Sequence, residues 1–192
     1  MATEYEHKFR ATPADLSAIN EAFSGDTQKI AMQTTYYDTP SSQLSARRYT
    51  LRRRLENGKS VCALKVPAGA ARGEWETECE AIEAAIPALL AAGAPGELQE
   101  LAKEGLFPIC GAKFTRLAKT IPLEGGQVEL ALDQGSLFGG GWELPLYEVE
   151  VELKTGTQEL CDRFAQVLAE QFHLMPEPQS KFSRALKLYK GE

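Results

Sequence analysis

Charged side chains recur at every second position in several short segments of this chain, and this alternation constrains the fold more than any other feature. Successive side chains of a strand point to opposite faces, so residues two apart share a face. The rule places Glu148, Glu150 and Glu152 together on one face of the segment YEVEVELK. The other face of that segment is aromatic and aliphatic. The segment therefore predicts a strand with one charged face and one apolar face.

Other segments repeat this alternation. The charged or small residues that share a strand face are Glu4 with Glu6 and Lys8, Arg52 with Arg54, Ala63 with Lys65, Glu74 with Glu76, and Glu129 with Ala131 and Asp133. For a single strand, a solvated polar face explains the pattern equally well. Considered together, opposed like charges on neighbouring strands repel each other unless cations lie among them. We therefore expect these charged faces to line the interior of a barrel.

Turn and helix signals predict an α+β protein with mainly antiparallel strands. Asn57-Gly58 is a strong hairpin signal between two strands, and Thr12-Pro13 is typical of a helix start. Further helices are expected at 81–106, where Pro87 interrupts the pattern, at Thr157–His173, and at Ser180–Lys190. About eight antiparallel strands are enough to close a barrel. We expect residues 1–192 to form one domain, an eight-stranded closed barrel or tunnel with a charged interior and helices packed outside.

Composition narrows the range of partners and compartments. The formal net charge of -6 argues against general nucleic-acid binding, although a locally basic site is compatible with an acidic protein. The apolar runs are too short to span a bilayer, so no membrane partner is expected. The four cysteines are widely spaced and form no CxxC pair, which favours free thiols in a reducing cytoplasm. Both a monomer and a homodimer remain open.

The charged residues suit a phosphate site. Carboxylates are the preferred protein ligands of Mg²⁺ and Mn²⁺, and arginine binds phosphate oxygens in a bidentate manner. Phosphoryl transfer depends mainly on positioning and charge neutralisation, so it requires no nucleophilic serine or cysteine. No GxxxxGK[ST] loop occurs in the chain. The expected interior would therefore hold a multiply charged phosphate anion together with metal ions.

A series of motifs supports this interpretation. The pattern ExExK at Glu4–Lys8 is common by itself in charged chains, but further motifs follow it in order: Tyr37-Asp38-Thr39-Pro40, Leu51-Arg52-Arg53-Arg54, Ala63-Leu64-Lys65, Arg72-Gly73-Glu74-Trp75-Glu76, Glu129–Gly135, Glu148–Glu152, and Ser180-Lys181 with Arg184. Together they cover essentially the whole chain. In this order they resemble the CYTH superfamily, the triphosphate tunnel metalloenzymes, and most closely its bacterial inorganic triphosphatase branch.

The resemblance implies a tunnel with two divalent-metal positions for Mg²⁺ or Mn²⁺. It implies a catalytic set of Glu4, Glu6, Lys8, Glu76 and Asp133. The implied metal ligands are Glu4, Glu6, Glu74, Glu76, Glu129, Glu148 and Glu150. The implied phosphate-binding residues are Arg52, Arg54, Lys65, Arg116, Lys181 and Arg184. The segment around Arg116, AKFTRLAK, equally suits a solvated basic strand.

The function that the resemblance implies is hydrolysis of a small-molecule triphosphate, with tripolyphosphate cleaved to pyrophosphate and phosphate. The alternatives are a class IV-type adenylyl cyclase, a thiamine triphosphatase or another organic triphosphatase, and a non-catalytic module that binds polyphosphate or a nucleotide. Some bacterial triphosphatases of this family also carry a C-terminal helical CHAD domain. The chain ends about where that domain would begin, so it either lacks the domain or belongs to a longer protein.

Overall fold

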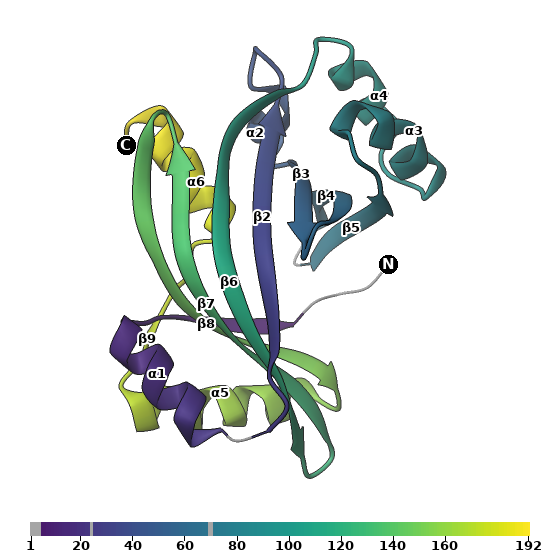
Figure 1. Ribbon diagram of the computed structural model, residues 1–192. Coiled ribbons are helices and arrows are strands. Elements are labelled where there is room, and N and C mark those ends of the chain that lie inside the picture. Colours follow the sequence, from purple (N-terminus) through teal and green to yellow (C-terminus); the bar gives the residue numbers. More distant parts are fainter. Residues whose placement is uncertain (1–4, 24, 69–70) are drawn as a thin grey trace.

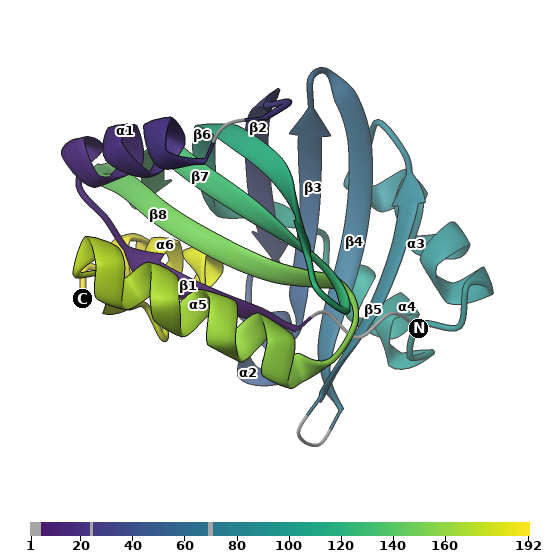
Figure 2. The same cartoon turned by 90° about the horizontal axis from the view of Figure 1, so that it is seen from below.

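The computed structural model describes residues 5–23, 25–68 and 71–192. Within these residues, nine strands form one antiparallel sheet in the order β5-β4-β3-β2-β6-β7-β8-β1-β9 (Figure 1). The strands are β1 (Glu6–Arg10), β2 (Gln28–Asp38), β3 (Thr50–Glu56), β4 (Lys59–Ala68), β5 (Ala71–Glu78), β6 (Phe107–Leu123), β7 (Gly126–Gly139), β8 (Trp142–Thr155) and β9 (Met175–Pro176). The sheet is strongly curved, as the view in Figure 2 shows. The prediction of an α+β protein with mainly antiparallel strands is confirmed.

The helices begin and end largely where the sequence signals lie. They are α1 (Pro13–Ala22), α2 (Gln43–Ala46), α3 (Ile82–Ala91), α4 (Glu97–Ala102), α5 (Gln158–Phe172) and α6 (Lys181–Lys190). Thr12 and Asp15 form a capping box at the start of α1, and Thr157 caps α5. Contrary to expectation, α3 continues through Pro87. Four buried residues hold α3 against the neighbouring strands, so tertiary packing outweighs the hydrogen bond that proline removes.

The prediction of an eight-stranded closed barrel is wrong. Closure requires the strands at the two ends of the sheet to pair, and no pairing joins β5 to β1 or β9 among the described residues. Part of the free edge of β1 is instead occupied by β9, where Phe9 lies opposite Pro176 and Arg10 opposite Met175. Pro176 has no N–H to continue the ladder. The result is an open, curved sheet with a concave and a convex face.

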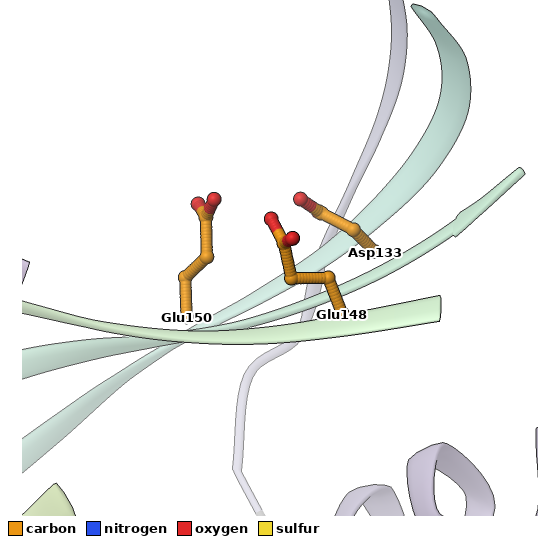
Figure 3. A group of neighbouring side chains, drawn as sticks. All are labelled: Asp133, Glu148 and Glu150. Carbon is orange, nitrogen blue, oxygen red and sulfur yellow. The ribbon is translucent and has the colours of Figure 1, made fainter. Parts of the chain in front are cut away.

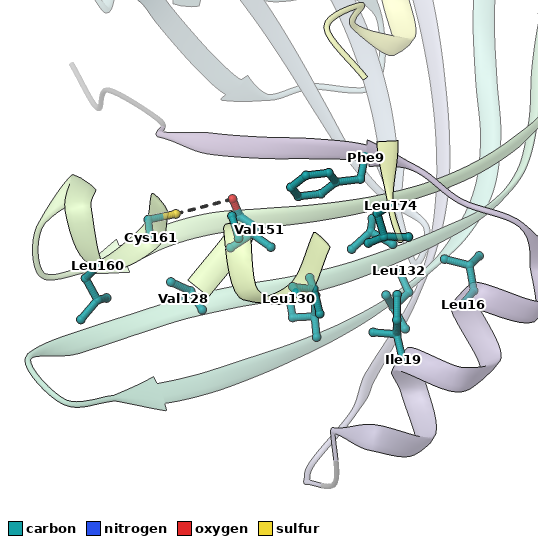
Figure 4. Packing of buried hydrophobic residues seen from close by; sticks show 13 residues of the cluster. Phe9, Leu16, Ile19, Val128, Leu130, Leu132, Val151, Leu160, Cys161 and Leu174 are labelled. Carbon is teal, nitrogen blue, oxygen red and sulfur yellow. Dashed lines mark hydrogen bonds between the residues drawn. The ribbon is translucent and has the colours of Figure 1, made fainter. Parts of the chain in front are cut away.

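Two apolar cores cover the convex face. In the first, aliphatic residues of β7 and β8 such as Leu130 and Val151 pack against α1 and α5 (Figure 4). In the second, Leu51 of β3 and Leu64 of β4 pack against α3 and α4. These residues alternate with the charged residues of the same strands. Helices therefore lie on the face opposite the charges at both ends of the sheet, as expected.

Helix α6 departs from that expectation, because it packs on the concave face. Its residues Phe182 and Ala185 belong to a third core with Tyr36, Leu137 and Leu146. Leu137 and Leu146 share strand faces with Asp133 and Glu148, so this core continues the charged face along the same strands. One half of the concave face is thus filled by α6, and the other half is left for a site.

Candidate active site

A cavity of about 330 Å³ lies on the concave face beside the first turn of α6. Seven cationic and five acidic side chains line it. The charged lining residues are Glu6, Lys8, Arg52, Arg54, Glu56, Lys65, Arg116, Glu129, Glu150, Glu152, Lys154 and Lys181. Clustered cations attract a polyanion even in a protein of net charge -6.

One wall of the cavity is cationic. Arg52 and Arg54 of β3 both line it, whereas the intervening Arg53 lies on the other face and donates to Ser60 Oγ at 2.9 Å. On the neighbouring strand β4, Lys65 reaches the same wall. The carboxylate of Glu74 lies 2.9 Å from Lys65 Nζ and 3.3 Å from Arg52 Nη2. Strand alternation therefore brings three predicted phosphate-binding residues together.

Arg54 is a half-buried cation among other cations. Burial, together with the positive charges of Arg52 and Arg116, lowers the pKa of its guanidinium. Its carboxylate neighbour is Glu56, 3.5 Å away and 41% exposed. Its Nε donates to Thr34 Oγ1 at 3.4 Å. A guanidinium in this setting is stabilised by any anion that enters the cavity.

The wall formed by β1, β7 and β8 is acidic. Glu6, Glu152 and Glu129 lie opposite one another across these three adjacent strands. The charges are partly balanced by Lys154, whose Nζ lies 2.9 Å from Glu152 and 3.7 Å from Glu129, and by Lys8, 3.4 Å from Glu6. All three carboxylates line the cavity and remain partly exposed. Their oxygens are the donors that Mg²⁺ and Mn²⁺ prefer.

A second acidic group lies deeper. Asp133, Glu148 and Glu150 project to the same side of β7 and β8 (Figure 3), and each offers a carboxylate oxygen within 4.8 Å of the others. The spacing would suit a metal ion. In this structure Lys181 Nζ lies among them, at 2.9 Å from Asp133 Oδ2 and 2.6 Å from Glu150 Oε1, and it also contacts Glu148.

Two arginines complete this network. Arg116 binds Asp133 in a bidentate manner through Nε and Nη2, at 2.8 and 2.7 Å, and also contacts Glu150. Arg184 contacts Glu148. Burial lowers the pKa values of Arg116 and Lys181, but the surrounding carboxylates outweigh it and raise both. Arg116 and Lys181 therefore stay charged beside these carboxylates.

The carboxylates of this network differ in depth. Glu150 lines the cavity, whereas Asp133 and Glu148 have fully buried side chains and lie behind Lys181 and Arg116. Burial and the Glu150 charge raise the pKa of Glu148 to about 7, against the opposing effect of Lys181. The pKa of Glu150 is lowered, because Lys181 and Arg116 outweigh its burial. Arg184 likewise lies outside the cavity lining.

The structure brings most of the predicted residues together, with clear exceptions. Glu76 is exposed and outside the cavity lining, because β5 is an edge strand of an open sheet. Glu4 falls outside the described residues.

Sequence reasoning missed Lys154 and Glu56 as lining residues, although the alternation that placed Glu152 and Arg54 would have found both. It also missed Glu177, a buried carboxylate near Arg184 that no strand pattern marks.

The donor chemistry of both acidic groups fits a hard divalent cation. Glu6, Glu129 and Glu152 are accessible from the cavity and have only two lysine partners among the described residues. In the deeper group, a metal would have to replace Lys181 Nζ among the three carboxylates. The oxygens of the deeper group thus lie close enough together for one ion, whereas the shallower carboxylates are the more accessible from the cavity.

Several known proteins are similar to this chain. An inorganic triphosphatase from Haemophilus influenzae is 28% identical over 165 residues, which make up 84% of this chain and 47% of that protein. The chain therefore spans about half the length of this relative. None of the described helices is long and apolar enough to cross a membrane.

Solved structures share the fold at low identity. A Hippeastrum protein, described as a candidate adenylyl cyclase with a dominant triphosphatase activity, matches with a TM-score of 0.67 and 18% identity, covering 98% of this chain and 96% of its own. A Pyrococcus horikoshii protein matches with a TM-score of 0.64 and 20% identity over 96% of this chain and 98% of its own. The CYTH domain family matches residues 2–186. On this evidence the chain belongs to the CYTH domain family.

Proposed function

We propose that this chain hydrolyses a triphosphate in the cavity with the help of a divalent metal, and that inorganic tripolyphosphate is its substrate. The single observation that carries the proposal is the setting of Arg54. This half-buried cation lines the cavity near Arg52 and Arg116, and the carboxylates of Glu6, Glu129 and Glu152 line the same cavity. A metal-bound polyphosphate would satisfy both walls at once. The likeness to an inorganic triphosphatase supports the same substrate.

Each wall has its own role in the proposal. Arg52, Arg54 and Lys65 on the cationic wall, together with Arg116 of β6 and Lys181 of α6, would bind phosphate oxygens through charged hydrogen bonds. Their spread over β3, β4, β6 and α6 suits an anion longer than pyrophosphate. Lys8 lines the cavity beside Glu6 and would contact the end of the same anion.

The metal would be held by the cavity-lining carboxylates Glu6, Glu129, Glu150 and Glu152, with Glu4 as a further candidate from sequence alone. When bound, Mg²⁺ or Mn²⁺ would neutralise phosphate charge and polarise the reacting phosphoryl group. A second metal site stays a prediction from the resemblance, as do the roles of Glu148 as a metal ligand and of Asp133 as a catalytic residue. All four cysteines are free, which supports a reducing cytoplasmic compartment.

The test is a panel of substrates. Phosphate release would be measured from tripolyphosphate, ATP, thiamine triphosphate and pyrophosphate, each with Mg²⁺ and with Mn²⁺, and cyclic AMP would be assayed in the ATP reactions. We expect tripolyphosphate to be cleaved fastest and pyrophosphate slowest. Cyclic AMP as the main product would favour the cyclase alternative. No turnover of any triphosphate would contradict the proposal and favour a binding module.

A further inference from the structure

Glu177 is a buried carboxylate that the site described above does not use. It lies between β9 and α6, its exposed fraction is 4%, and its backbone N–H donates to Lys8 O at 2.8 Å. Its side chain accepts from Arg10 Nε at 2.8 Å and from the backbone N–H of Gln179 at 2.9 Å. It therefore ties β1 to the segment that leads into α6.

The carboxylate of Glu177 is ionised at neutral pH. Burial alone would raise its pKa, but the Gln179 N–H and Arg10 outweigh burial and lower it. A buried charge is tolerated only when it is paired and hydrogen-bonded. One of its partners, Arg184 Nη1 at 3.7 Å, points back toward the cavity network.

From Arg184 an unbroken series of contacts leads to the cavity. Arg184 contacts Glu148, and Glu148 contacts Lys181, which lines the cavity. Arg184 and Lys181 are three residues apart on α6, so they share one face of the helix. Helix α6 begins directly at Lys181, with Ser180 as its capping residue. The Gln179 bond of Glu177 thus fixes the backbone just before this cap.

We propose that Glu177 is a positioning residue that holds Lys181 at the cavity wall, through Arg184 and Glu148 and through the start of α6. Glu177 is not among the cavity-lining residues, so it acts without touching the substrate. The inference rests on the proposed function in one respect, namely that Lys181 binds the triphosphate.

The test compares two carboxylates that tie β1 to C-terminal elements. Glu177→Gln should raise KM for tripolyphosphate about three- to tenfold, because a misplaced lysine loses part of a charged hydrogen bond. Asp162→Asn is the matched control. Asp162 accepts from Tyr5 Oη at 2.6 Å and binds His7 Nε2 at 2.7 Å on the convex side, so its removal should leave KM within about twofold. Arg10→Gln, at an exposed partner of Glu177, should act like Glu177→Gln but more weakly.

A double-mutant cycle distinguishes positioning from general stability. In a Lys181→Met background, Glu177→Gln should change kcat/KM by less than about twofold, since the group that it positions is absent. An undiminished effect of Glu177→Gln in that background would overturn the proposal. So would an unchanged KM for both Glu177→Gln and Arg10→Gln.

A second readout does not depend on turnover. In ¹⁵N-lysine-labelled protein, the enclosed Lys181 ammonium should give a slowly exchanging NH₃⁺ signal, assigned by its absence in Lys181→Met. Glu177→Gln should shift or broaden this signal, and Asp162→Asn should not. If the wild-type protein cleaves no triphosphate, the proposed function fails, yet this signal still decides the positioning role. A signal identical in Glu177→Gln and wild type would overturn it.

Discussion

The two ends of the concave face are built on the same strands yet have opposite characters. Toward the β7–β8 hairpin, Leu137 and Leu146 are fully buried under α6. A few residues further along the same faces of these strands, Asp133 and Glu148 begin the charged network, and Glu150 reaches the cavity. The side chains change from apolar to charged although they all lie on the same face of each strand.

Alternation therefore assigns a residue to one face of its strand, but it does not determine what covers that face. On these strands the concave face is apolar where α6 covers it and charged where it borders the cavity. Helix α6 marks the boundary, because Phe182 and Ala185 pack into the apolar core while Lys181 and Arg184 join the charged network. Substitutions at the apolar end should therefore lower stability, whereas substitutions at the charged end should lower activity.

The largest effect is expected at Lys181. In Lys181→Met, three carboxylates lose a shared cation, so we expect a stability loss of about 3–5 kcal/mol and a fall in kcat/KM of about a hundredfold or more. Denaturant unfolding and initial rates with tripolyphosphate would measure both. A folded variant with wild-type kcat/KM would show that the charged end is not the active site.

At the apolar end, Leu146→Ala should cost stability without changing chemistry. Leu146 is fully buried in the core beneath α6, and truncating such a residue costs about 2–5 kcal/mol. Under conditions where the variant is folded, kcat/KM should stay within about twofold of wild type. A large loss of kcat with intact stability would contradict the proposal that the apolar end has only a structural role.

Strand phase within the charged end can be tested on β3. Arg52→Ala and Arg54→Ala should each lower kcat/KM for tripolyphosphate about ten- to a hundredfold, the value of a charged hydrogen bond. Arg53→Ala is the control, since Arg53 binds Ser60 on the other face. Arg52→Lys should recover only part of the loss, because lysine cannot make a bidentate contact. If only Arg53→Ala lowered kcat/KM, the assignment of Arg52 and Arg54 to the cavity face would be wrong.

A pH effect is also expected at the charged end. The pKa of Glu148 is raised to about 7 in the folded protein by burial and by Glu150, whereas an unfolded glutamate titrates near 4.3. The folded state then binds the proton more tightly, so the stability contributed by this group is present at low pH and is lost as pH rises from about 4.5 to 7. The urea midpoint of the wild type should therefore fall between pH 5 and 8. In Glu148→Gln the urea midpoint should change less with pH. An identical pH dependence in both proteins would contradict the raised pKa of Glu148.

Much of the fold follows from local signals. The turn at Asn57-Gly58 joins β3 to β4, the capping box at Thr12 begins α1, and alternation separates Arg52 from Arg53. These features depend on neighbours in sequence, which is why the sequence predicts them. The family resemblance added Lys181, which lies on a helix and would not emerge from strand alternation.

Features that depend on distant contacts could not be predicted. Whether the sheet closes depends on pairing between strands at its two ends, and β9, two residues long, occupies part of the edge of β1. Burial of Asp133 and Glu148 behind Lys181 depends on α6 packing on the concave face. Lys119 is a similar case: it is buried at 5% exposure and its Nζ donates to the carbonyl oxygen of Asn20 at 2.8 Å, near the end of α1. Its sequence context suggests only a solvated basic strand.

We propose that the charged end of the concave face is a metal-dependent triphosphate site. The most direct test is phosphate release from tripolyphosphate by protein treated with EDTA and then titrated with Mg²⁺ or Mn²⁺. Activity should disappear in excess chelator and return with added metal, because the acidic wall admits the anion only when a cation neutralises it. Undiminished hydrolysis in excess EDTA would contradict it.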